Sequence, residues 1–296
     1  MRESEWTNEK HGCQWRNTLA TYAYPVIGSI YVREIDQSHI MRVLEPIWLF
    51  KTETVTRLRG RIENILDWAR VRGYRSGENP ARWRGHLDIL LPTPGKVQKI
   101  KHHPALPYDE LGEFIVKLRQ QEGMGARALE FAILTAARSG EVRGASWSEI
   151  NVAEATWVIP SERMKAKREH RVALNKEAMT SIEALPRSHE LIFPNNKGTK
   201  LSDMTLTAVL RRMGRSDITA HGFRSTFRDW CSERTNYPRD VAEMALAHSI
   251  GDKVEAAYRR GDLFEKRRLM MRDWGKFSVQ VKSSANIVPI MQKSGT

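Results

Sequence analysis

The chain has 296 residues, which is long for one compact core and enough for two domains of unequal size. With 41% hydrophobic and 28% charged residues it has the composition of a folded protein, which excludes a mostly disordered chain. The formal net charge of +13 points to a polyanionic partner, with nucleic acid the leading candidate. Two distant cysteines exclude a disulfide scaffold, and no apolar run suits a membrane span or a signal peptide. We therefore expect an intracellular, cytoplasmic protein that does not use a membrane.

Residues 1–100 carry helical patterns. Asp36 can cap a helix whose apolar residues recur at steps of three and four from Ile40 to Trp48. A longer amphipathic segment follows, with an apolar stripe that runs from Leu58 to Ala69. Its other face is predicted to be basic and to carry most of the arginines of the segment: Arg57, Arg61 and Arg72.

The stretch 92–104 combines proline, glycine and basic residues without periodicity, which is typical of a linker. We expect a helical domain over residues 1–100, a second domain over 104–281 and a tail over 282–296. The adjacent His102 and His103 are expected to be solvated rather than to bind a ligand. Residues 1–104 hold 17 basic and 11 acidic residues and the remainder holds 31 and 24, so the two parts carry +6 and +7. Both domains could therefore contact a polyanion.

After the linker the pattern is again mainly helical, with one exception. Two β-type runs, 156–160 and 170–174, are joined by the basic stretch 163–168, which predicts a small sheet with a basic turn. The expected fold class is mainly α with a small β-sheet: a helical domain followed by a mixed α/β domain. The expected helices of the second domain cover 111–118, 126–137, 202–214, 221–234, 238–248, 253–260 and 264–279.

Three positions in the second domain could contribute to a phosphate site. The segment Leu134–Val142 is an apolar helix that delivers Arg138 into a Ser-Gly break, where its guanidinium could bind a phosphate. The alternative is an Arg138–Glu141 pair that caps a turn. His221 and Arg224 lie at i and i+3 of a helix start, but one such pair is expected by chance in so basic a chain.

Two later residues also have ordinary explanations when each is considered alone. His248 follows Ala-Leu-Ala and could be a helix C-cap, and Tyr258 lies in a basic helix where it could simply be packed or exposed.

The order and context of these residues are more specific than any one of them. The first arginine follows Leu-Thr-Ala-Ala, the lysine of the basic turn, Lys165, follows Met before a His-x-Val strand, and the last histidine follows Leu-Ala. The set resembles the tyrosine recombinase family, the phage integrases, and most closely the prophage integrases of the satellite-phage type. The resemblance runs from about residue 8 to about residue 280 and includes Gly73–Pro80. The matching positions, in chain order, are Arg138, Lys165, His221, Arg224, His248 and Tyr258.

The resemblance implies an activity and a role for each residue. Tyr258 would be the nucleophile that forms a 3′-phosphotyrosine, while the two arginines would clamp the scissile phosphate. Lys165 would be the general acid on the leaving 5′-oxygen, His221 a base or oxygen ligand, and His248 a hydrogen-bond donor to the phosphate. One phosphodiester is exchanged for a phosphotyrosine and back, so the energy of the bond is retained. The resemblance therefore implies a reaction without ATP, another cofactor or a metal ion.

The resemblance also implies partners. A core-binding domain and a catalytic domain would enclose double-stranded DNA at an attachment site, as a tetramer in a bacterial cytoplasm near the nucleoid, with a host DNA-bending factor and a directionality factor as accessory partners. The chain starts at or just before the core-binding domain, so we expect an N-terminal arm-binding domain to be absent from residues 1–296. The alternatives are a type IB topoisomerase, which shares the chemistry, and a catalytically inactive DNA-binding regulator. A metal-dependent nuclease would need clustered carboxylates, which the sequence does not offer.

Overall fold

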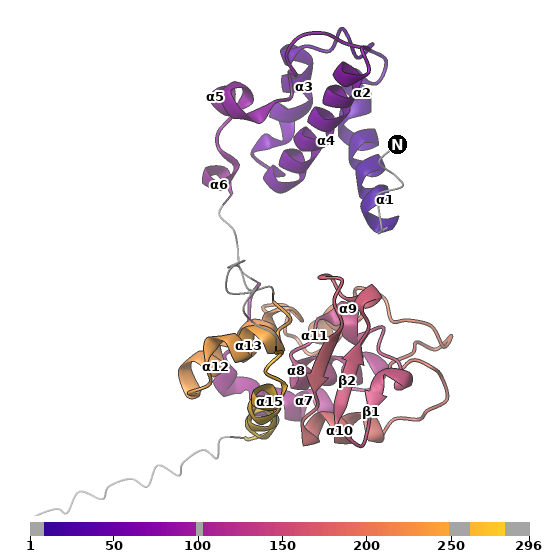
Figure 1. Ribbon diagram of the computed structural model, residues 1–296, viewed down its shortest axis with the longest axis vertical. Helices are drawn as coiled ribbons and strands as arrows, with labels where there is room; N and C mark the ends of the chain where they lie inside the picture. Colours follow the sequence, from indigo (N-terminus) through magenta and orange to yellow (C-terminus); the bar gives the residue numbers. More distant parts are fainter. Residues whose placement is uncertain (1–8, 99–102, 249–260, 282–296) are drawn as a thin grey trace, which may run out of the picture. The chain divides into compact units, whose positions relative to one another are not determined.

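The chain forms two compact units, residues 1–102 and 103–296, in the computed structural model shown in Figure 1. The structure describes residues 9–98, 103–248 and 261–281. The first unit is helical, and the second is mainly helical with a small antiparallel sheet, so the predicted fold class is confirmed.

The first unit is built from helices joined by short turns. Two of these turns are π-helical, over Leu19–Ala23 and Trp83–Leu87. The helices are α1 (Glu9–Thr18), α2 (Tyr24–Ile27), α3 (Gln37–Trp48), α4 (Thr52–Val71), α5 (Asp88–Leu90) and α6 (Pro94–Val97).

The predicted cap and apolar period of α3 are both confirmed. The Asp36 carboxylate accepts a hydrogen bond from the backbone N–H of His39, at 3.0 Å, and so satisfies a donor that the first turn leaves free. The apolar face is buried against the rest of the unit, and each fully buried aliphatic side chain such as Leu44 stabilises the fold by about 1.5–3 kcal/mol. At the end of α3, Trp48 stacks on Trp83 and donates to the carbonyl of Pro92.

The expectation for the basic face of α4 is wrong at one position. The side chain of Arg61 points inward and is only 7% exposed. Its guanidinium donates to the backbone carbonyl of Gln14, at 2.7 Å, and to the hydroxyl of Thr18, and it lies over the ring of Trp15. An arginine can be buried in this way when its donors meet oxygen acceptors, and here it joins α1 to α4.

The expected linker over 92–104 is too long. Residues Pro94–Val97 form α6, which packs on α4, and the half-buried Val97 touches the core of the first unit. At the other end, His103 and Pro104 belong to the second unit. Residues 99–102, which include His102, lie outside the described residues.

The second unit places helices around a sheet. Within the described ranges its helices are α7 (Leu111–Arg119), α8 (Met124–Thr135), α9 (Ser139–Val142), α10 (Lys176–Glu183), α11 (Thr205–Arg212), α12 (Gly222–Arg234), α13 (Arg239–Ala245) and α15 (Phe264–Ser278). The expected helices over 111–118, 126–137, 202–214, 221–234, 238–248 and 264–279 are present, most with shorter bounds. Helix α10 was not predicted, and the expected helix over 253–260 lies outside the described residues.

The sheet is antiparallel in the order β1-β2-β3. The predicted pair is observed as β2 (Thr156–Ile159) and β3 (His170–Ala173), with Ile159 opposite His170, and the basic turn joins them. Strand β1 (Ile150–Asn151) was too short to be predicted.

Helix α8 runs through the centre of the second unit. Most of its residues are buried, from Ala126 to Thr135, and it contacts α7, α10, α11 and α15. A helix that is buried on most sides belongs to the core, and its position is fixed by its neighbours. The residues that follow its C-terminal end are therefore held in place as well. No helix in the described ranges is both long and apolar enough to cross a lipid bilayer.

Candidate active site

Three segments that are far apart in the sequence meet around the guanidinium of Arg224. This residue lies in the first turn of α12 and is 6% exposed. Its Nη1 donates to the carbonyl of Ala136, just after α8, at 2.5 Å, and its Nη2 donates to the carbonyl of Leu246, just after α13, at 2.6 Å. Ala136 has a left-handed φ of 52°, which turns the chain sharply and presents that carbonyl. The arginine thereby ties the ends of α8 and α13 to the start of α12.

The second arginine, Arg138, reaches the same place from the start of α9. Its Nη2 donates to the carbonyl of Ala247, at 3.1 Å, beside the carbonyl that Arg224 binds. Its Nη1 donates to the carboxylate of Glu141, at 2.7 Å, and its backbone N–H donates to the same carboxylate. The alternative explanation from the sequence, an Arg138–Glu141 pair at a turn, is therefore also correct. This pair orients the guanidinium of Arg138 and does not remove it from the site. The arginine side chain stays 25% exposed, so it is open to a ligand.

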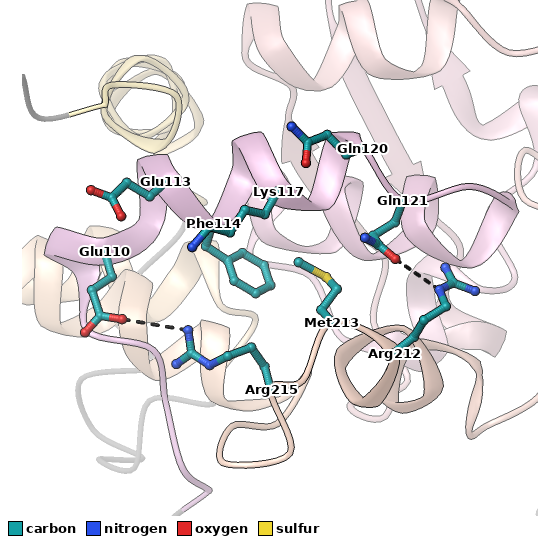
Figure 2. A pocket seen from close by; sticks show the side chains of 9 residues that line it. All are labelled: Glu110, Glu113, Phe114, Lys117, Gln120, Gln121, Arg212, Met213 and Arg215. Atoms are coloured by element: carbon teal, nitrogen blue, oxygen red, sulfur yellow. Dashed lines mark hydrogen bonds and ion pairs between the residues drawn. The ribbon is translucent and has the colours of Figure 1, made fainter.

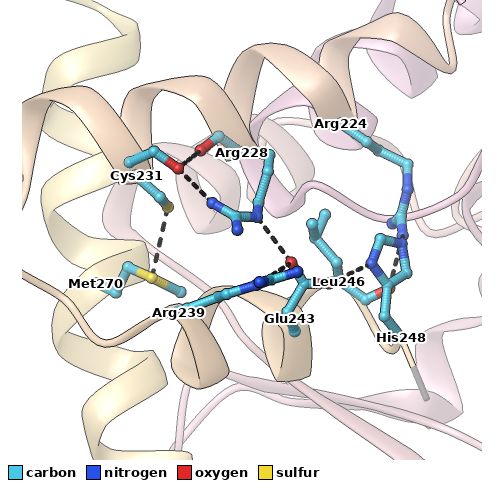
Figure 3. A network of polar contacts seen from close by, with 9 residues as sticks. Arg224, Arg228, Cys231, Arg239, Glu243, Leu246, His248 and Met270 are labelled. Atoms are coloured by element: carbon cyan, nitrogen blue, oxygen red, sulfur yellow. Dashed lines mark hydrogen bonds and ion pairs between the residues drawn. The ribbon is translucent and has the colours of Figure 1, made fainter. Parts of the chain in front are cut away.

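His248 follows α13 and lies directly against Arg224 (Figure 3). The ring atom Nε2 is 3.1 Å from Nη2 of the arginine, and Nδ1 is 2.7 Å from a carboxylate oxygen of Glu243. Its backbone N–H donates to the carbonyl of Glu243, so the helix-cap interpretation of this histidine is correct as well. The side chain is 44% exposed and lies at the open edge of the group.

His221 stands at the N-terminal end of α12, three residues before Arg224. His103 is exposed, as expected, and its ring also packs edge-on against the ring of His221 with centroids 4.6 Å apart. The chain beside His103 is held closely: Thr219 N–H donates to the carbonyl of Pro104, and a Cβ on Gly222 would lie 2.1 Å from that oxygen. Only glycine fits there.

The group carries a surplus of positive charge. Burial, and then the neighbouring Arg138, lower the pKa of Arg224 to about 10, while Glu141 and Glu243 oppose the shift. Burial, followed by Arg224, His103, Arg138 and His248, lowers the pKa of His221 below its ordinary value, so its imidazole is neutral near pH 7. The Nε of Arg224 is buried and has no hydrogen-bond partner among the described residues. Such a site suits an anion.

A further histidine, His170, lies close to this group, and sequence reasoning did not select it as a site residue. It is the first residue of β3, and burial, then Arg267, lower its pKa to about 4, while Glu141 and the carbonyl of Ala245 oppose the shift. It is therefore a neutral imidazole in the wall of the site. The His-x-Val pattern used to identify the lysine contained it, but only as context.

Lys165 is exposed, in the turn between β2 and β3, and no contact is observed between its side chain and the described site residues. The residue before it, Met164, is buried. The guanidinium of Arg163 contacts the carboxylate of Glu149 and the carbonyl of Glu141, whose carboxylate holds Arg138. The base of the turn is thus fixed to the site, while the lysine itself extends from it.

The proposed nucleophile, Tyr258, lies outside the described residues. Another tyrosine of the second unit, Tyr237, is described, and it is engaged elsewhere. Its hydroxyl donates to the carboxylate of Asp273 at 2.6 Å, and burial together with this contact raises its pKa to about 12. A phenol held in this way is a poor nucleophile. Of the six predicted residues, four come together: Arg138, His221, Arg224 and His248.

A separate hollow of about 360 Å³ lies along α7, next to the end of α11 (Figure 2). Two of its arginines are engaged within the lining: Arg212 donates to the side-chain oxygen of Gln121, and Arg215 faces the carboxylate of Glu110. None of the predicted site residues lines it, so it is not the candidate active site.

Family models and curated relatives match nearly the whole chain. Residues 1–86 match the model of the phage integrase central domain, and residues 107–262 match the phage integrase family. The integrase of Enterobacteria phage P4 is 30% identical over 294 residues, which cover 91% of this chain and 65% of the relative. Prophage integrase IntA of Escherichia coli (strain K12) is 31% identical over 283 residues, covering 93% and 66%. The chain thus spans about two thirds of the length of these relatives.

Solved structures share the fold at low sequence identity. A lambda integrase dimer bound to a COC′ core site has a TM-score of 0.66 at 15% identity and covers 84% of this chain and 91% of its own. The Tn1549 transposon integrase in complex with circular intermediate DNA has a TM-score of 0.61 at 12% identity and covers 91% and 95%. The family models match in the same order as the two units, and the second match contains all six site residues that the sequence pattern selected. The chain therefore belongs to the phage integrase family, as its residues suggested.

Proposed function

We propose that this chain is the core-binding and catalytic part of a site-specific DNA recombinase. It cleaves and rejoins DNA strands through a 3′-phosphotyrosine and so integrates or excises a prophage or another mobile element. The observation that carries the proposal is that three distant segments bring Arg138, His221 and His248 to the guanidinium of Arg224. Such a set of fixed donors suits a phosphoryl group that gains negative charge during transfer.

Each step of the proposed reaction has a residue for it. The Tyr258 oxygen attacks the scissile phosphorus, and the bond from phosphorus to the 5′-oxygen breaks. Lys165 gives its proton to that leaving oxygen, and the neutral His221 accepts the proton of the tyrosine. The two arginines stabilise the charge on the non-bridging oxygens. Rejoining reverses these steps with a new 5′-hydroxyl, so that bond energy is conserved and no cofactor or metal ion is needed.

The chain positions on either side of Tyr258 are held to the second unit, which supports the choice of this tyrosine. His248, ten residues before it, contacts Arg224 and Glu243. Asp262, four residues after it, accepts hydrogen bonds from Arg171 and Arg267, both at under 3 Å. The described residues before and after the segment that contains Tyr258 are therefore both held to the second unit.

The proposed partner is double-stranded DNA at an attachment site. Both units are basic, and fold relatives have been solved on DNA, including a lambda integrase tetramer bound to a Holliday junction. For this chain we propose residues 1–100 as the core-binding domain and 104–281 as the catalytic domain. We further propose assembly as a tetramer on DNA at the bacterial nucleoid, aided by a host DNA-bending factor and a directionality factor.

Two alternatives make different predictions from the same site. A type IB topoisomerase would form the tyrosine adduct but would not join strands from two different duplexes. An inactive DNA-binding regulator would bind the duplex and form no adduct. The match of residues 1–86 to the integrase central domain favours the recombinase over the topoisomerase. Adduct formation separates the recombinase from the inactive regulator.

The test is a covalent adduct assay in EDTA. The chain is mixed with a pool of labelled duplexes, each nicked within a randomised core, and adducts that survive SDS are sequenced to recover the preferred site. We expect an adduct with the wild-type chain and none with Tyr258→Phe, whose DNA affinity stays nearly unchanged. Tyr237→Phe is the matched control and is expected to form the adduct. An adduct with Tyr258→Phe would show that the nucleophile is another residue.

A further inference from the structure

The side chains that gather at the candidate active site are not all held in the same way. Those of Arg138, Arg224 and His248 each make hydrogen bonds to other described residues. The exposed ring of His221 makes no hydrogen bond or ion pair with any residue that the structure describes, and it does not cap α12. It packs edge-on against the ring of His103, with centroids 4.6 Å apart. This ring contact therefore restrains an imidazole that is otherwise free to turn about its side-chain bonds.

Residues 103–106, which we call the strap, are fixed to the beginning of α12. The carbonyl of Pro104 accepts a hydrogen bond from the backbone N–H of Thr219, just before the helix, at 3.1 Å. The carbonyl of Leu106 accepts from the hydroxyl of Thr226, in the helix, at 2.6 Å, and both of these residues are buried. The strap is thus tied at two points, and the residue at its start is held in place by them.

The strap also lies very close to the backbone of α12. A Cβ on Gly222 would be 2.1 Å from the carbonyl oxygen of Pro104 and 2.9 Å from the Cα of Ala105, both too close for a side chain at that position. Glycine at the residue next to His221 therefore allows the strap to approach. His103 begins the second unit and meets His221 at a place that the backbones of both segments set.

His103 could act on its neighbour through its charge as well as through its ring. Burial and then Arg224 lower the pKa of His221, followed by His103, Arg138 and His248. Above neutral pH the imidazoles lose their charge, so that only the ring contact is left. A test of the ring contact therefore belongs at about pH 8 and needs a variant that keeps a ring without nitrogen atoms.

We propose that His103 is a positioning residue for strand cleavage, whose ring holds the imidazole of His221 in the orientation that takes part in proton transfer. The strap supplies the fixed base for this contact. The role in cleavage rests on the proposed function, whereas the contact between the two rings is a property of the free chain and is measured without DNA. His103 itself transfers no proton in this account.

Two substitutions test the ring of His103 at pH 8. His103→Ala removes the ring, and His103→Phe keeps an aromatic ring without the nitrogens. In spectra of the free chain, the ring-proton signals of His221, assigned by their loss in His221→Gln, should lose their ring-current shift in His103→Ala and keep most of it in His103→Phe. With saturating protein, the rate of adduct formation should fall about tenfold in His103→Ala and less than about twofold in His103→Phe, with an unchanged Kd for DNA. The control His189→Ala removes another exposed imidazole of the second unit and should change none of these.

The outcomes separate this inference from the proposed function. Unchanged His221 signals in His103→Ala overturn the inference whatever the DNA assays show. Equal rate losses in His103→Ala and His103→Phe would assign the effect to the nitrogens, and weaker binding with an unchanged rate at saturation would make His103 a DNA contact. Either result overturns the positioning role. Failure of the wild-type chain to form any adduct would instead contradict the proposed function, while the spectra would still decide whether His103 holds His221.

Discussion

Arg61 of the first unit and Arg224 of the second unit are both buried, and their surroundings differ. Arg61 in the first unit is 7% exposed and Arg224 in the second is 6% exposed. Burial is the main cause that lowers the pKa of both. Arg61 donates to a backbone carbonyl and a hydroxyl and lies over a tryptophan ring. Arg224 donates to two carbonyls, but it also contacts His248 and lies near Arg138.

The difference shows that burial alone does not mark a functional arginine. Arg224 differs from Arg61 because a second guanidinium and two imidazoles lie near it. The neighbouring carboxylates neutralise only part of the positive charge of this group. A group that gathers donors in this way is costly to the fold unless an anion completes it. We interpret Arg61 as a structural link between helices and Arg224 as a phosphate ligand.

The largest expected effect is on the rate of adduct formation when each of the two buried arginines, Arg224 and Arg61, is replaced by methionine. Arg224→Met should lower the rate of adduct formation by roughly 1,000-fold or more, because donors aimed at developing charge make the largest contribution to such a reaction. Arg61→Met should leave the rate per folded molecule nearly unchanged and reduce the free energy of unfolding by about 1–3 kcal/mol, since its acceptors lose their donor. Adduct kinetics and denaturant unfolding on both variants check the pair. Equal rate losses would break the distinction.

Lys165 is an exposed member of the proposed site, whereas Arg224 is a buried one. Lys165→Ala should lower the rate on an ordinary phosphodiester by roughly 100-fold. On a substrate with a 5′-thiol leaving group most of this loss should disappear, because a thiolate departs without a proton. Lys167→Ala, in the same exposed turn, is the control and should be close to wild type on both substrates. Equal loss on both substrates would make Lys165 a phosphate contact and not the acid.

We expect His170 to make the stability of the second unit depend on pH, and we expect no such dependence from the first unit. The pKa of His170 is about 4 in the folded chain against an ordinary 6.5, so the unfolded chain binds a proton that the folded chain excludes between these values. Stability therefore falls as the pH falls through this window, by about 3 kcal/mol from this group. Unfolding of wild type and His170→Gln between pH 7 and pH 4 measures the difference. A difference that does not change with pH would contradict a buried neutral His170.

The smallest effect concerns the exposed charge of the two units. Each phosphate that is neutralised contributes about −0.9 to the slope of log affinity against log salt. Both units are basic, so residues 103–296 alone should show a shallower slope and weaker binding than the full chain on the same duplex. Identical slopes would mean that the first unit does not contact DNA.

Local features of the fold could be predicted from the sequence. The cap at Asp36, the period of α3 and the β-type runs on either side of the basic turn depend on residues close in the chain. The inward turn of Arg61 could not, because its acceptors lie on α1, more than forty residues earlier. Periodicity places an arginine on a helix face without showing what packs there.

The site divides in the same way. The resemblance selected Arg138, His221, Arg224 and His248, and the structure brings them together. The resemblance did not point to Glu243, whose contact with His248 needs the left-handed turn at Ala247. Nor did it identify His103, whose contact with His221 depends on Pro104 packing against Gly222. These residues act through contacts between segments, which a motif in one segment does not contain.

The central claim is that Arg138 and Arg224 stabilise negative charge on one scissile phosphate. The most direct measurement replaces that phosphate by an uncharged methylphosphonate in the duplex recovered from the pool and compares adduct rates for wild type, Arg138→Ala and Arg224→Ala. The account predicts large losses for both variants on the phosphodiester and a much smaller loss on the methylphosphonate, which has less charge to neutralise. Equal losses on the two substrates would contradict it, because the arginines would then act on the fold and not on the charge of the phosphate.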